Sequence, residues 1–137
     1  MAPFDQTGFE LAPAMKPSRE LVPDLPAPVD PVLDTLVKAR EWLSDPAHWT
    51  KRRAWRDRCG VATEHRHQVG STCAIGAVTL FFDAGEDIRI SVESAFWLDS
   101  FVPEQFPAVP EFNDHKNTKH ADVLAMYDRA IAARKAA

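Results

Sequence analysis

Cysteine is scarce in this sequence, which has only Cys59 and Cys73 among its 137 residues. Two cysteines are too few for the disulfide framework that stabilises small secreted domains. The chain also lacks an apolar run near the roughly 20 residues that a membrane-spanning helix needs. It does not begin with the basic and apolar segments of a signal peptide. We therefore expect a cytoplasmic protein without a membrane partner.

An excess of positive charge is missing as well. The formal net charge is −4 at pH 7, which argues against nucleic acid as the main partner, although it allows a local basic patch. The sequence contains no glycine-rich phosphate loop, no paired-carboxylate constellation and no His-Glu-x-x-His motif. We therefore expect no cofactor and favour a non-enzymatic role. The length suits one domain with at most an appendage.

Proline, in contrast, is plentiful near the N-terminus. Residues 1–29 contain six prolines, and no helical or alternating pattern survives them. We expect an extended arm there, either as a simple tail or as a docking segment that lies across its own domain or a partner. The apolar residues that would anchor such a segment are Phe4, Phe9, Leu11, Met15, Leu21, Val22 and Leu25.

Residues 30–137 predict a single, mainly α domain. Asp30-Pro31 is a strong helix start, because Asp caps the free N–H groups and Pro at the first helical position sacrifices no hydrogen bond. The clearest helix covers residues 121–131, and Asp122 suits its positive N-terminal end. We expect a compact bundle of four to five helices. The apolar stripe of this last helix comprises Val123, Leu124, Tyr127, Ala130 and Ile131.

The middle of the chain is less clear. Residues 47–60 are compatible with a helix that ends at Gly60 as a left-handed cap, and residues 61–70 are expected to form a loop. We favour a buried helix over a strand for residues 73–82, because its small residues share one face and would let another helix approach closely. Residues 88–101 also favour a helix. A polar loop is expected from Phe112 to the last helix. The small face comprises Cys73, Gly76, Ala77 and Leu80.

Three pieces of the chain, taken in order, resemble the DUF6197 family of small bacterial and phage-associated proteins of unknown function. The resemblance covers about residues 33–132. It implies a compact, mainly helical fold and a link to phages or other mobile elements, but no activity. The pieces are Ala39-Arg40-Glu41-Trp42-Leu43-Ser44-Asp45-Pro46 with Trp49-Thr50, then Cys73-Ala74-Ile75-Gly76-Ala77, then Phe112-Asn113-Asp114 leading to Ala121-Asp122-Val123-Leu124-Ala125 and Asp128-Arg129-Ala130-Ile131.

One candidate site is a basic, aromatic stretch that would bind a protein partner. Arginines interleaved with tryptophans can grip phosphates and stack on bases, but at this net charge an acidic protein is the better partner. The alternative is that the tryptophans pack on the core and the arginines are solvated. Nothing in the pattern sets the oligomeric state, so a homo-oligomer stays open. The candidate partner-binding residues are Trp49, Arg52, Arg53, Trp55 and Arg56.

A second candidate is a small-molecule or hydrolase site around Cys73 and Asn113-Asp114-His115. A helix N-terminus would stabilise the Cys73 thiolate, and His115 or His120 could act as its base. The alternatives are a buried, inert cysteine and an Asn113-Asp114 pair that braces the loop and ties it to the helix beginning near residue 71.

A third candidate is a zinc site that holds the domain together. Cys59, His65, His67 and Cys73 are the residue types that bind zinc, and they lie close together in the sequence. Their spacing matches no standard zinc finger. If no metal binds, Cys59 is a lone thiol near a helix end and the two histidines lie on the surface.

Overall fold

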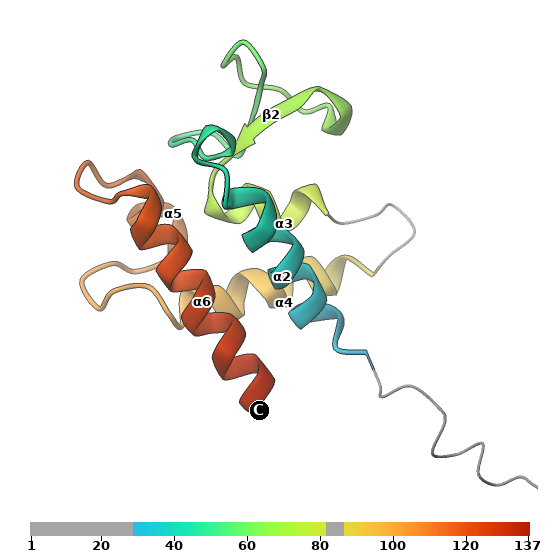
Figure 1. The fold of residues 1–137 in the computed structure, drawn as a ribbon, viewed down its shortest axis with the longest axis vertical. Helices are drawn as coiled ribbons and strands as arrows, with labels where there is room; N and C mark the ends of the chain where they lie inside the picture. The colour runs from blue at the N-terminus through green and yellow to red at the C-terminus, as the bar shows by residue number, and fades with distance from the viewer. Residues whose placement is uncertain (1–28, 82–86) are drawn as a thin grey trace, which may run out of the picture.

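The computed structural model describes residues 29–81 and 87–137 (Figure 1). The predicted arm, residues 1–29, lies outside these residues except for Val29. The described part contains five α-helices, two short 3-10 helices and one two-stranded sheet, which confirms the mainly α class. In chain order the elements are α2 (Pro31–Leu43), η2 (Pro46–His48), β1 (Trp55–Asp57), η3 (Arg66–Gln68), β2 (Val69–Thr72), α3 (Ala74–Leu80), α4 (Ile88–Asp99), α5 (Val109–Asp114) and α6 (His120–Ala136).

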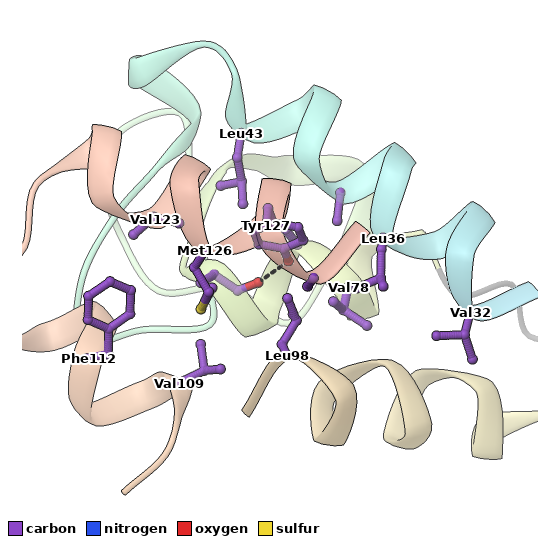
Figure 2. Packing of buried hydrophobic residues seen from close by; sticks show 14 residues of the cluster. Val32, Leu36, Leu43, Val78, Leu98, Val109, Phe112, Val123, Met126 and Tyr127 are labelled. Carbon is purple, nitrogen blue, oxygen red and sulfur yellow. Dashed lines mark hydrogen bonds between the residues drawn. The ribbon is translucent and has the colours of Figure 1, made fainter. Parts of the chain in front are cut away.

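Helix α2 begins where the sequence predicts. The Asp30 carboxylate accepts hydrogen bonds from the backbone N–H groups of Val32 and Leu33, and Pro31 occupies the first turn. One face of the helix then carries an apolar residue at every third or fourth position. Figure 2 shows this face directed into the core, where its side chains are almost completely buried: Val32, Leu36, Ala39 and Leu43.

Helix α6 packs against α2 and α4. Tyr127 is fully buried in the core between α2 and α3, and its hydroxyl donates to the carbonyl of Ala74 at 2.6 Å (Figure 2). The predicted stripe is correct for Val123, Tyr127 and Ala130. Leu124 and Ile131, which share one edge of the stripe, are only partly buried, whereas Met126 on the other edge is fully buried.

The prediction of a helix over residues 47–60 is wrong. Only η2 is helical there, and β1 pairs antiparallel with β2 to form a hairpin. The backbone hydrogen bonds that a helix would make are replaced by bonds to distant residues, such as Thr50 N–H to Thr72 O and Cys73 N–H to Ala54 O. Gly60 does have a positive φ of 85°, but it lies in the tight turn after β1.

The helices predicted around residues 73–82 and 88–101 are confirmed as α3 and α4. One residue of the small face of α3 contacts the hairpin instead of another helix. Gly76 is approached by the backbone of Ala54 just before β1, and a Cβ at position 76 would overlap the Ala54 carbonyl oxygen. Gly76 therefore makes room for the hairpin, whereas Ala77 of the same face is buried in the core where α3 packs against α2.

The polar loop predicted from Phe112 onward is shorter than expected. Residues 109–114 form the short helix α5, with Pro110 in its first turn, and Asp99 accepts a hydrogen bond from the backbone of Val109 at 3.0 Å. Proline near a helix start resembles a helix-breaking signal in the sequence, which explains the error.

The hairpin lies at the end of the molecule opposite the C-terminal residue (Figure 1). No helix in residues 29–81 and 87–137 has the length and apolar character that crossing a membrane requires.

Candidate functional site

The hairpin is fixed to the helices by tryptophan side chains. Each of the four tryptophans donates its indole N–H to an oxygen on another element, and three of these bonds involve the hairpin or the segment just before it. Because the ring packs while its N–H is satisfied, each indole anchors two elements. The four bonds run from Trp42 to Thr72 Oγ1, from Trp49 to Asn113 Oδ1, from Trp55 to Gly76 O, and from Trp97 to Ala130 O.

Asn113 is the polar centre of this junction and is fully buried. Its Oδ1 accepts from the indole of Trp49 at 2.7 Å and from the backbone N–H of Ala74 at 3.0 Å. Its Nδ2 donates to Thr50 O at 3.2 Å and to Asp114 Oδ1 at 3.0 Å. All four hydrogen-bonding positions of the amide are used. The interpretation that Asn113 ties its segment to the start of α3 is therefore confirmed.

Asp114, the neighbour of Asn113, holds the backbone of Arg52 in an unusual conformation. Its Oδ1 accepts from the backbone N–H of Arg52 at 2.8 Å, and Arg52 has a φ of 73°. Arginine rarely adopts this left-handed conformation, so the surrounding contacts must hold it there. The result is a turn with a fixed backbone that carries the consecutive residues Arg52 and Arg53.

The five predicted partner-binding residues divide into two groups. Trp49 and Trp55 are half-buried and bonded to other elements through their indole N–H groups. Arg56 is also engaged, because its guanidinium donates to Thr50 Oγ1 at 2.8 Å, to Gly60 O at 2.9 Å and to Lys51 O at 3.0 Å. These three side chains stabilise the hairpin, which agrees with the alternative proposed for the tryptophans.

Arg52 and Arg53 behave differently. Both are exposed, and neither side chain makes a hydrogen bond or ion pair with another residue of the described chain. We call this pair the arginine turn. Of the neighbouring cations, Lys51 donates to His115 O at 2.6 Å and lies over the Trp49 ring. Arg58 is exposed and, like the arginine turn, makes no side-chain hydrogen bond or ion pair in the described chain. The sequence identified Arg52 and Arg53, but nothing in it distinguishes them from Arg56.

The structure does not arrange Cys73 for catalysis. Cys73 caps α3, and its sulfur accepts from the backbone N–H of Gly76 at 3.2 Å. Burial raises the pKa of the Cys73 thiol, and the backbone N–H bonds only partly oppose this effect. The expected thiolate at the helix N-terminus is therefore not favoured.

Neither predicted base makes a hydrogen bond to the Cys73 thiol. The Nδ1 of His115 accepts from the backbone of Asn117 at 3.1 Å, and Nε2 of His120 donates to the Leu43 carbonyl at 2.6 Å. The candidate ligand group of Cys73, Asn113, Asp114 and His115 is divided between the buried junction and the surface.

His115 instead lines a separate open hollow of about 360 Å³ between α5, α6 and the segment before α5. Phe106 and Phe112 give it an apolar side. Its charged groups are already engaged: Asp122 accepts from the backbone of Lys119 at 2.8 Å, and Arg129 donates to Phe101 O at 2.8 Å. Cys73, Asn113 and Asp114 do not line this hollow.

The four candidate zinc ligands are not brought together either. Cys59 is exposed, while Cys73 caps α3, and both are free thiols. The rings of His65 and His67 lie 5.9 Å apart on the surface. Among residues 29–81 and 87–137, no three His, Cys, Asp or Glu side chains group in a way that could hold a metal ion. These residues therefore do not form the predicted zinc cluster.

No curated protein and no solved structure matches the sequence. A family model matches residues 27–133, which is most of the chain and includes α2, the hairpin, the Asn113 junction and nearly all of α6. The chain therefore belongs to DUF6197, a family of unknown function.

Proposed function

We propose that the protein is a non-enzymatic interaction module that binds an acidic surface of a protein partner through the arginine turn. The observation that carries this proposal is the contrast between Arg52 and Arg53, which have no partner in the described chain, and Arg56, which makes three hydrogen bonds. An exposed arginine offers five N–H donors that match a carboxylate in pairs.

The rigidity of the turn supports the proposal. The backbone of Arg52 is fixed by Asp114, which is itself bonded to the buried Asn113. A turn held in this way loses little conformational freedom on binding, so more of the interaction energy appears as affinity. Arginine is also enriched among the residues that dominate binding at protein interfaces.

Nucleic acid is the less favoured partner of the same arginines. The chain has a net charge of −4. The two tryptophans that could stack on bases are half-buried, and Lys51 lies over the Trp49 ring and Arg66 over the Trp55 ring. An aromatic platform for bases needs exposed ring faces. The hydrolase and zinc alternatives lack the convergent side chains that they require.

We place this module in the cytoplasm. Both cysteines are free, and the exposed Cys59 would be prone to oxidation outside a reducing compartment. The link to phages or other mobile elements that the family resemblance implies directs the search for the partner to proteins encoded by such elements.

The test is a quantitative capture experiment with tagged full-length protein. Charge reversal of the turn, Arg52→Glu with Arg53→Glu, is compared with Lys116→Glu plus Lys119→Glu. The control reverses two exposed lysines and changes the net charge equally. We expect the arginine variant to bind the acidic partner protein at least about tenfold more weakly than the wild type does. A tenfold weaker affinity corresponds to ~1.4 kcal/mol. The wild type and control should retain it, and raising the salt concentration should weaken it.

Two outcomes would contradict the proposal. Equal capture by all three proteins would show that the arginine turn is not the contact. Capture of nucleic acid that nuclease treatment abolishes would assign the turn to a different class of partner. Thermal unfolding of each variant is measured in parallel, and we expect transitions near that of the wild type because these side chains are exposed and the two arginines make no hydrogen bond or ion pair with a described residue.

A further inference from the structure

Helix α4 exposes an apolar stripe that nothing in the described chain covers. Ile88, Val92 and Phe96 recur at four-residue spacing, so they share one face of the helix. Their side chains are 66%, 48% and 68% exposed. The opposite face of α4 is buried through Ser91, Ser94 and Leu98. We call the three exposed residues the α4 stripe.

The size of the stripe decides what kind of occupant it fits. A stable protein–protein interface buries ~800 Å² on each partner. The stripe supplies less than this interface area, because it consists of three partly exposed side chains. The aromatic one contributes roughly 150–250 Å² at most. A second copy of the chain or a free partner would therefore bind weakly. A tethered segment has an effective concentration on the order of millimolar, so a small patch is sufficient to hold it.

The chain enters the described part of the structure beside α4. Asp30, which caps α2, is paired with Arg134 through a 2.8 Å bond. The same guanidinium lies 3.6 Å from Glu93 and stacks over the ring of Trp97, and both of these residues belong to α4. The residue before Asp30, Val29, is 78% exposed. Only the side chain of Arg134 separates Asp30 from α4, so the segment that precedes Val29 starts close to the α4 surface.

We propose that residues 21–28 of the same chain dock across the α4 stripe. This segment supplies three apolar residues close to the point of entry, Leu21, Val22 and Leu25. Eight residues reach about 28 Å when extended, whereas the stripe is about 12 Å long from Ile88 to Phe96 at the rise of an α-helix. The tether therefore spans the stripe with length to spare.

The docking also explains the pattern of prolines. Pro23, Pro26 and Pro28 restrict the backbone to extended conformations. A restricted segment loses less conformational entropy when it binds a surface than an unrestricted one does. The segment is thus suited to covering a shallow apolar stripe, and it leaves the arginine turn free because that turn belongs to a different element.

The first test uses amide NMR spectra of the full-length protein. Leu21→Ser with Leu25→Ser is compared with Leu11→Ser plus Met15→Ser, which also removes two apolar residues but lies farther from the point of entry. We expect the first pair to shift the signals of residues 88–96 and the control pair to leave them in place. Unchanged signals in both variants, or equal shifts, would overturn the proposal.

The second test identifies the chain that supplies the segment. In a full-length Cys59→Ser background, Leu25→Cys is combined with Val92→Cys on the stripe or with Val37→Cys on α2. Val37 is also exposed, at 41%, and is within reach of the same segment. We expect an intramolecular disulfide with Val92→Cys to form at least about tenfold faster than with Val37→Cys. Equal rates would overturn the proposal, and disulfides mainly between two molecules would assign the stripe to a second copy.

Discussion

Trp49 donates its indole N–H to Oδ1 of Asn113 at 2.7 Å, which joins η2 and the hairpin to α5 through a bond between residues 64 positions apart. The same oxygen accepts from the first residue of α3. One buried amide thus holds three segments in place, and the arginine turn depends on it through Asp114.

Asn113→Ala should be among the most destabilising polar substitutions in the chain. It would leave the Trp49 indole N–H and the Ala74 backbone N–H without their acceptor in a buried place, at about 1–3 kcal/mol for each unsatisfied group. We expect a loss of about 2–4 kcal/mol in the free energy of unfolding, measured by chemical denaturation. Asn117→Ala, at an exposed asparagine, is the matched control and should change it by less than about 0.5 kcal/mol. Similar losses in both variants would refute the central role of Asn113.

Gly76→Ala should separate the hairpin from α3. A methyl group at this position would overlap the carbonyl oxygen of Ala54, which is backbone and cannot rotate away. We expect a cost of about 1–3 kcal/mol, although alanine favours helices intrinsically. Thr79→Ala, at an exposed position on the same helix, is the control: it removes a hydrogen bond to Gly76 O at 3.0 Å but adds no atom that overlaps the hairpin. An unchanged or increased stability of Gly76→Ala would show that the hairpin shifts without loss.

Tyr127 should make the fold sensitive to high pH. Burial raises the pKa of Tyr127 well above its usual value, so the folded state keeps the proton that an unfolded tyrosine releases near pH ~10. The stabilisation is complete below that unfolded pKa and is lost as the pH rises toward the folded pKa. Unfolding measured between neutral and alkaline pH should therefore show a decline that Tyr127→Phe reduces.

The same substitution has a cost at neutral pH. Tyr127→Phe removes the hydrogen bond to Ala74 O, and we expect a loss of about 1 kcal/mol in the free energy of unfolding there. Identical alkaline profiles of the wild type and Tyr127→Phe would show that another group causes the decline.

Asp30 should make the fold sensitive to acid. The hydrogen bond from Arg134 lowers the pKa of Asp30 below its usual value, assisted by the backbone N–H groups of Leu33 and Val32. A lowered folded pKa gives stability that is present above the unfolded pKa of about 3.9 and is lost as the pH falls through the folded pKa. Asp30→Asn keeps a capping side chain but removes the charge, so it should flatten the acid side of the stability profile.

Asp30→Ala separates the two functions of this residue. It removes the cap as well as the charge, and loss of an N-cap costs about 1 kcal/mol. We expect Asp30→Ala to be less stable than Asp30→Asn at neutral pH by about that amount. Equal stability of the two variants would mean that the cap contributes nothing to α2.

The helices were predictable where local signals agree with one another. Asp30-Pro31 predicts the start of α2 to the residue, because capping is a local property. The hairpin was not predictable in this way. Trp55 pairs with Thr72, and the register shifts between Arg56 and Asp57, so its strands are fixed by contacts between distant residues that a short sequence window does not contain.

The candidate site was predictable in composition but not in arrangement. The sequence identifies Asn113 as a bracing residue because asparagine side chains bond to nearby backbone groups. It also identifies the arginines of residues 51–58. Which arginine faces solvent depends on the φ of Arg52 and on the carbonyl groups that surround Arg56, and both follow from the tertiary fold.

The placement of the four tryptophans has a consequence for spectroscopy. Every indole donates its N–H across a boundary between two segments, so intrinsic fluorescence reports mainly on the opening of these boundaries. Far-ultraviolet circular dichroism reports on the helices themselves. If the hairpin detaches before the helices unfold, the fluorescence transition will precede the dichroism transition. The difference between the two transition midpoints will then measure how far this chain departs from two-state unfolding.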